Sequence, residues 1–187
     1  MRPRAALVAL IGLVVLPGYA RLPAPAPPVE KVQPVQGYGY GARRMTMAEA
    51  EGIAGQFRAG ARWCGTLDAR YRADCLADQY NQIWAGMPRT GDFRTLREAT
   101  RAADKQLNAL ARSSRDRAER PRAGGQASRP LVPVAAAALP QVNAAAQAVI
   151  TEAATRLLRA ADDDPALAGQ FSLIANALES GKVLLRS

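Results

Sequence analysis

Cys64 and Cys75 are the two cysteines of this 187-residue sequence. An even number of cysteines favours a disulfide in an oxidising compartment. On one continuous helix the pair would lie about 16.5 Å apart along the axis, whereas a disulfide joins Cα atoms within about 7 Å. We therefore expect the chain to turn between them, at Gly65, Thr66 and Asp68. The alternative is a straight helix whose two thiols share one face and bridge partner chains.

The sequence contains no histidine. Histidine is the commonest general base at neutral pH and the commonest metal ligand, and two cysteines cannot by themselves complete a four-ligand zinc site. This composition weighs against Ser-His-Asp hydrolases, Cys-His nucleophiles, haem sites and His-based metalloenzymes. We therefore predict no cofactor, no metal and no enzymatic activity.

Residues 179–181 are Glu179, Ser180 and Gly181. They resemble the Glu-Ser-Gly element of lytic transglycosylases, which are exported helical enzymes that cleave peptidoglycan with a single Glu as the acid. The resemblance covers three residues. A peptidoglycan-acting hydrolase is therefore one functional hypothesis. We rank it third, below an adaptor and a binding protein, because we expect the groove-forming part of such a fold to be missing here.

Four large rings surround the cysteines: Trp63, Tyr71, Tyr80 and Trp84. Rings at helical spacing more often form a hydrophobic core than a binding site. We therefore expect an aromatic cluster in the core. The alternative is a pocket for a small molecule or a glycan, which would make the protein a small-molecule or glycan binding protein.

The formal net charge is +9, and residues 89–129 carry 11 Lys or Arg against 5 Asp or Glu. Arg94, Arg97 and Arg101 recur at helical spacing, so they could converge on one anion through their forked guanidinium groups. Two plainer explanations are intrahelical ion pairs, such as Glu98 with Arg101, and a basic face that only keeps the protein soluble.

Residues 1–20 are typical of a secretory signal peptide, with Arg2 and Arg4 before an apolar run of 12 residues and with Ala20 at the cleavage site. That run is shorter than the roughly 20 residues that span a bilayer, so we expect no transmembrane segment after cleavage. We predict export to the periplasm or the outside of the cell. Nucleic acid is then not an expected partner; an acidic protein or an anionic envelope component is.

The remaining chain divides by composition into four parts. Residues 21–45 are a Pro/Gly-rich linker, which we expect to be a disordered tether. Residues 46–120 contain three helical patterns, residues 121–139 are a Pro/Ala/Gly linker, and residues 140–187 contain a helical hairpin. No segment alternates as a strand would.

Several helix boundaries have local signals. Thr46 and Glu49 form a capping box, and a second helix is expected to begin near Asp68. The apolar stripe of the third helix starts at Phe93, with the helix end expected at Pro121 and Gly124–Gly125. The fifth helix is expected to begin with Asp164 at the N-cap.

The predicted fold class is therefore all-α, a small bundle of about five helices built from helical hairpins. The function hypothesis is an exported, non-enzymatic structural or adaptor protein of the cell envelope that uses a basic helix face.

Overall fold

The computed structural model describes residues 43–186; the predicted signal peptide (1–20) and residues 21–42 of the predicted tether lie outside these described residues. The described part is all-α, as predicted, and contains no strand. In chain order its helices are α1 (Met47–Gly65), α2 (Ala69–Gly86), α3 (Phe93–Ser113), the 3-10 helix η1 (Ala136–Ala138), α4 (Leu139–Asp163) and α5 (Ala168–Val183). None of these helices is long and apolar enough to cross a bilayer.

The predicted starts of the first two helices are confirmed. Glu49 donates its backbone N–H to the Thr46 hydroxyl (3.2 Å), and the Glu49 carboxylate accepts from the Thr46 N–H (2.9 Å), which completes the capping box. Asp68 accepts from the Arg70 N–H at 2.9 Å. These side chains satisfy backbone donors that the first turn of a helix leaves without a partner.

The end of α3 differs from the prediction. The helix stops at Ser113, about two turns before Pro121, because the backbone beyond it finds other partners. Asp116 donates its N–H to the Pro133 carbonyl, and the Ser114 carbonyl accepts from the Ala135 N–H, each at 2.8 Å. The polar residues that follow the apolar stripe therefore form a return path toward α4 instead of extra helical turns.

The predicted start of the fifth helix is also wrong. Asp164 accepts from the Ala166 N–H at 3.1 Å, but this contact caps only a single turn, and α5 begins at Ala168. The preceding helix continues to Asp163. Asp162 and Asp163 therefore lie at the C-terminal end of α4, where the helix dipole does not favour negative charge.

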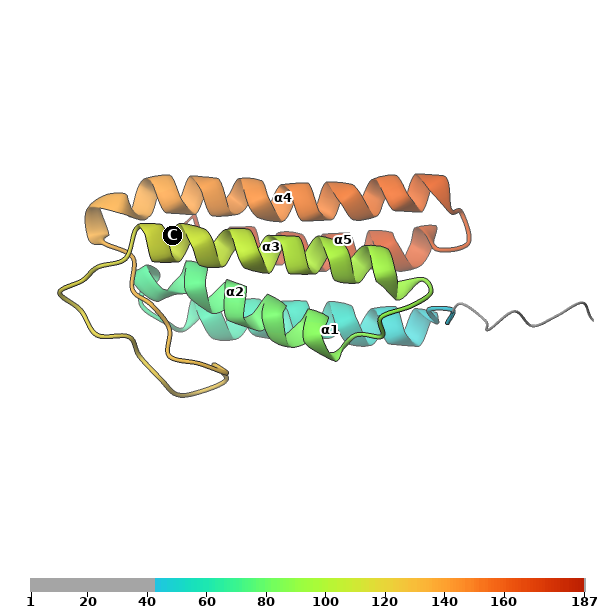
Figure 1. Cartoon of the computed structure of the whole chain (residues 1–187). Coiled ribbons are helices and arrows are strands. Elements are labelled where there is room, and N and C mark those ends of the chain that lie inside the picture. Colours follow the sequence, from blue (N-terminus) through green and yellow to red (C-terminus); the bar gives the residue numbers. More distant parts are fainter. Residues whose placement is uncertain (1–42, 187) are drawn as a thin grey trace, which may run out of the picture. The chain divides into compact units, whose positions relative to one another are not determined.

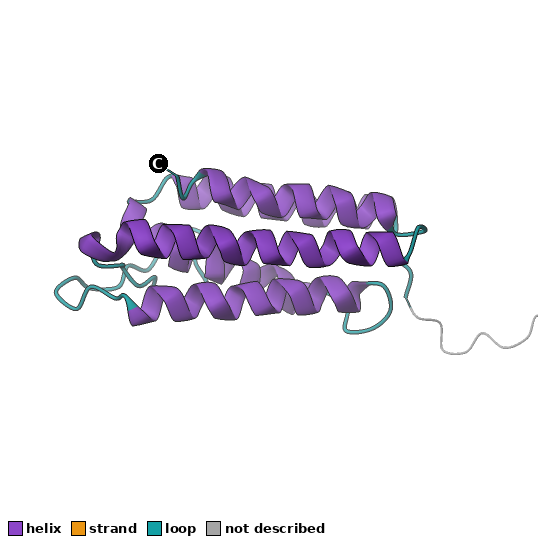
Figure 2. Ribbon diagram, turned by 90° about the horizontal axis from the view of Figure 1, so that it is seen from above, coloured by secondary structure: helices purple, strands orange, loops and turns teal. Residues whose placement is uncertain are grey.

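The five α-helices lie side by side (Figures 1 and 2), and the contacts between them close into a ring. α1 packs on α2 and α5, α5 on α4, α4 on α3, and α3 on α2. One hydrophobic cluster receives side chains from each of the five α-helices, for example Phe57, Leu76, Leu96, Leu157 and Ile174. The three N-terminal helices and the C-terminal hairpin therefore share one core.

Residues 114–135, which we call the strap, connect α3 to η1 and contain most of the predicted 121–139 linker (Figure 1). Two isolated antiparallel bridges, Arg115 with Val134 and Arg122 with Leu131, join its outgoing and returning halves. Val134 is fully buried and donates its N–H to the Arg70 carbonyl of α2 at 2.8 Å. Because the strap packs on α2, most residues of α2 between positions 71 and 80 are buried.

Candidate functional site

The disulfide prediction is confirmed. Cys64 and Cys75 are bonded within the chain, with their Cα atoms 5.7 Å apart. The chain turns between them at Thr66, whose N–H donates to the Trp63 carbonyl at 3.0 Å. Both cysteines are completely buried, so the straight-helix alternative, with thiols facing a partner, does not apply.

The strap is attached to α2 by a buried ion pair. Asp74 is fully buried, and its two carboxylate oxygens accept from the two terminal nitrogens of Arg129, each at 2.7 Å. The Val132 N–H also donates to Asp74 at 2.7 Å. The hydrogen bonds to Asp74 raise the pKa of Arg129, so its guanidinium stays charged. Such a two-pronged contact is the strongest geometry for an Arg–carboxylate pair.

A second buried carboxylate lies one turn further along α2. Asp78 accepts from the N–H and the hydroxyl of Ser128, at 2.8 and 2.5 Å, and from Gln82 at 2.9 Å. Gln79 and Gln82 both donate to the Gln126 carbonyl. The polar side of α2 therefore faces the strap and not the solvent.

These two carboxylates bind the strap. Each is occupied by hydrogen bonds from the strap, and no group of three His, Cys, Asp or Glu residues gathers as metal ligands in residues 43–186. Their role is to hold the strap on the bundle. The sequence did not predict them, because Asp74 and Asp78 are four residues apart, a spacing that is typical of a solvent-exposed helix face. The signal that could have indicated a buried strap is the apolar run of residues 131–134 inside the predicted linker.

Three of the four predicted aromatic residues belong to the core: Tyr71 and Tyr80 are buried in it and Trp63 packs against it, whereas Trp84 lies outside this cluster. Tyr80 is in the core, where its ring meets Phe57 edge to face at a centroid distance of 5.2 Å. Trp84 lies between α2 and α3 and donates its indole N–H to the buried Asp104 at 2.9 Å. Trp63 and Tyr71 lie at the opposite end of the α1–α2 hairpin, next to the strap.

The predicted arginine trio is also divided. Arg97 and Arg101 both stack on the Trp84 ring, at 4.8 and 5.2 Å from its centroid. Arg97 donates to the carbonyls of Trp84 and, at 3.0 Å, of Met87, so it caps the C-terminal end of α2. Arg94 is exposed. The structure therefore gives Arg97 a structural role and does not aim the three guanidinium groups at one point.

A different basic row runs along the outer face of α3. Arg94, Arg101, Lys105 and Arg112 are all exposed, and at 3.6 residues per turn they fall within about 20° of one line. The row is about 27 Å long. None of the four forms an ion pair with a described residue, and the predicted Glu98–Arg101 pair is absent from the ion pairs of residues 43–186. We call these four residues the α3 row.

A cavity of about 280 Å³ lies where the strap crosses the α1–α2 turn. We call it the strap pocket; its walls include Trp63, Asp68, Tyr71, Arg122 and Gly125. The Arg122 guanidinium stacks on the Tyr71 ring at 5.2 Å. Burial, together with a hydrogen bond to Glu119, raises the pKa of Tyr71, so the phenol stays protonated and donates to Glu119 at 2.9 Å.

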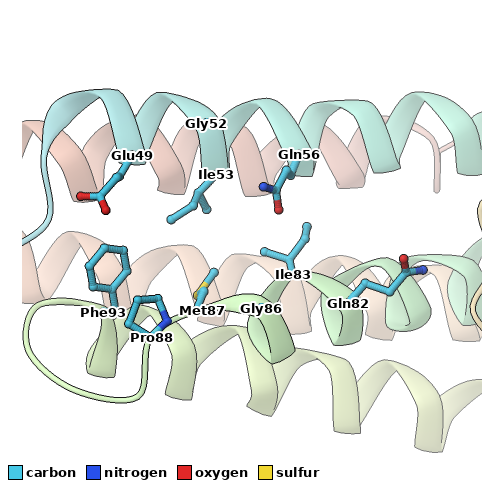
Figure 3. A pocket seen from close by; sticks show the side chains of 10 residues that line it. All are labelled: Glu49, Gly52, Ile53, Gln56, Gln82, Ile83, Gly86, Met87, Pro88 and Phe93. Carbon is cyan, nitrogen blue, oxygen red and sulfur yellow. The ribbon is translucent and has the colours of Figure 1, made fainter.

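A second cavity, of about 330 Å³, opens at the far end of the same hairpin (Figure 3). Ile53 of α1 faces Ile83 of α2 and Met87, the residue that follows α2, across it, and Phe93 and Pro88 lie at one end. The disulfide holds α1 and α2 together at one end of the hairpin, and this groove lies toward the other. Its walls combine these apolar side chains with the polar side chains of Glu49, Gln56 and Gln82.

Glu179, the residue behind the transglycosylase resemblance, lies on α5 and is paired with Lys182 at 2.5 Å. The neighbouring Gly181 packs against Tyr80, so that a Cβ at this position would lie 3.0 Å from the Tyr80 hydroxyl. Gly181 therefore has a packing role in the core.

Comparison with known protein families, with curated proteins and with solved structures finds no match to this chain.

Proposed function

We propose that the protein is an exported, non-enzymatic adaptor of the cell envelope that binds an acidic segment of a partner protein along the α3 row. The observation that carries this proposal is the row itself: four exposed cations on one line of one helix, without an acidic partner among the described residues.

The charge of this segment is not neutralised internally. Of the acidic residues between positions 89 and 122, Asp92 accepts from the Met45 N–H, Asp104 from Trp84, Asp116 from the Ala118 N–H and Glu119 from Tyr71. Glu98 is the one exposed carboxylate on α3. Since these acids serve the fold, the basic residues beside them are left to attract an external anion.

The chemistry of the row favours carboxylates on an extended partner. Three of its four members are arginines, whose planar fork matches a carboxylate better than the ammonium group of lysine does. No large apolar side chain of α3 is exposed, so the face offers nothing to insert into a bilayer. An acidic protein segment therefore fits better than a membrane surface.

Two further observations are compatible with export. The chain carries an intrachain disulfide, which is typical of oxidising compartments. It also begins with a segment that has the composition of a signal peptide.

The test is binding of a fluorescent Glu-rich peptide to the mature protein, measured by anisotropy at several salt concentrations. We expect the variant R94E/K105E/R112E to weaken binding at least tenfold, a loss of about 1.4 kcal/mol. The matched control is R58E/R62E/R159E, which makes the same change in net charge at exposed positions of α1 and α4 and should bind as the wild type does.

Two results would contradict the proposal. If the control variant loses as much affinity as the α3 variant, only net charge matters and no binding face exists. If an anionic polysaccharide such as polyglucuronate binds more tightly than the peptide at equal charge, the partner is an envelope polymer and not a protein.

A further inference from the structure

The strap pocket combines a flat apolar wall with hydrogen-bond donors that have no partner. From this we infer a second site: we propose that it binds a small carboxylate that carries a single ring. The site is independent of the α3 row, since its residues come from α1, α2 and the strap.

The wall is made by Trp63 and Leu131, with Tyr71 behind the Arg122 guanidinium that stacks on its ring. Trp63 is half-buried and packs against the core, whereas Tyr71 and Leu131 are buried. These side chains are held in place, because the disulfide at Cys64 fixes the end of α1 and Glu119 holds the Tyr71 hydroxyl. A rigid aromatic and aliphatic wall suits one face of a ring.

The donors lie on the strap side of the same cavity. The Trp63 indole N–H and the backbone N–H groups of residues 123–125 form no hydrogen bond with any described residue. Arg122 is 69% exposed, and its terminal nitrogen lies 3.9 Å from Glu119, so most of its donors remain open. Donors without acceptors favour an anionic ligand.

The acidic side chain in the pocket wall is already paired. Asp68 accepts from the backbone N–H and the guanidinium of Arg70, and these hydrogen bonds lower the pKa of Asp68. The Trp63 carbonyl is also occupied, because the Thr66 hydroxyl donates to it at 2.7 Å. An incoming carboxylate would therefore meet donors, and the nearest acid is paired with a cation.

Gly125 packs closely against the edge of the Trp63 indole. It has a φ of +61°, and a Cβ there would lie 2.8 Å from Trp63 Cζ2 and 3.0 Å from Nε1. A side chain at this position would clash with the indole, so glycine allows the strap to form the pocket beside the ring. With its volume of about 280 Å³, the cavity is at the small end of ligand sites, which commonly measure about 300–1,000 Å³, so one ring is the size that fits.

The experiment follows ligand binding by ¹H–¹⁵N correlation spectra of the mature protein. The chain has two tryptophans, and the variant W84F assigns the Trp63 indole N–H signal. The probes are benzoate and glucuronate, with benzyl alcohol and glucose as neutral counterparts and acetate as the carboxylate without a ring. We expect benzoate or glucuronate to shift the Trp63 indole and the 124–125 amides saturably, with a dissociation constant of about 1 mM.

Variants locate the site. R122Q should weaken binding about tenfold, as loss of a charge-assisted hydrogen bond would. A123E, at an exposed lining position, should abolish binding by repulsion. R120Q and A118E are the matched controls, because they make the same changes at exposed strap positions that do not line the pocket.

The two ring probes distinguish an aromatic acid from a sugar acid, and a saturable response to either supports the site. Shifts of equal size with acetate would overturn the proposal, because they would show only general attraction of anions. A neutral counterpart that binds as tightly as its acid would overturn the role of the donors. No saturable shift with either acid, in a folded protein, would show that the pocket is not a ligand site.

Discussion

Arg129 reaches the fully buried carboxylate of Asp74 with both terminal nitrogens, across 55 residues of chain. This pair joins the strap to α2. The attraction between the two charges itself contributes little net stability. Removing Arg129 would be costly because it would leave the Asp74 carboxylate buried without water and without a counterion.

We therefore expect R129A to destabilise the protein by about 3 kcal/mol. The side chain of Arg129 is 27% exposed, so the value should fall at the lower end of the range for buried pairs. The measurement is urea denaturation followed by circular dichroism. R117A, at an exposed strap position, should be neutral; equal losses in both variants would mean that the pair does not anchor the strap.

The disulfide should contribute substantially to the free energy of unfolding, although the loop that it closes is short. Reduction of the bond between Cys64 and Cys75, separated by 11 positions, is expected to cost about 3 kcal/mol by the loop-entropy estimate. Guanidinium denaturation with and without reductant measures it, and the double variant C64A/C75A should not respond to reductant. A wild type equally stable in both conditions would contradict the prediction.

Arg97 and Arg94 offer a matched comparison on one helix. R97A removes the cap of α2 and a stacking partner of Trp84, so we expect a loss of about 1–2 kcal/mol. R94A removes an exposed side chain and should change stability by less than about 0.5 kcal/mol. R97K should recover only part of the loss, because an ammonium group lacks the planar fork; full recovery would indicate that charge alone matters.

Replacing Gly91 and Gly52 by alanine should change the stability of the protein in opposite directions. Gly91 has a φ of +70°, and a Cβ there would lie 2.2 Å from the Arg43 carbonyl oxygen, so G91A should cost about 2–3 kcal/mol. Gly52 is an exposed residue inside α1 with nothing within 4 Å of an added Cβ, so G52A should stabilise by about 0.5–1 kcal/mol. Thermal melts of both variants test the pair, and a stable G91A would show that the Arg43 segment can move aside.

Asp68 should make stability depend on pH. Its hydrogen bonds to Arg70 lower the pKa of Asp68 below its value in the unfolded chain, so its contribution is present above about pH 4 and is lost as the pH falls through the folded-state pKa. D68N should therefore be less stable than the wild type at pH 7 and similar to it at pH 2. Urea titrations at both pH values measure this, and a constant difference between the two proteins would contradict it.

Local signals predicted much of this fold. The Thr46 capping box, the helix start at Asp68 and the turn between the cysteines each depend on residues close in sequence. Such signals can be found in a single sequence, because the backbone N–H groups that a helix end leaves without a partner are satisfied by side chains only a few residues away.

The strap and its pocket could not be predicted in the same way. Asp74 and Arg129 are 55 positions apart, and neither residue carries a local mark of burial. A segment rich in proline and glycine is typical of a linker, whereas here Leu131 and Val134 are buried against the bundle. The division of the aromatic residues between two ends of a hairpin likewise depends on how α1, α2 and the strap pack together.

The presence of two cysteines in the whole chain also bears on how the protein matures. A chain with two cysteines has one intramolecular pairing, so oxidation cannot produce a wrongly connected monomer that an isomerase must correct. The partners are only 11 positions apart, so they can meet as soon as α1 and α2 form a hairpin, before α4 and α5 have packed on it. An oxidase is then sufficient for the covalent step, and the long-range contacts of the strap can form afterwards on a hairpin that is already closed.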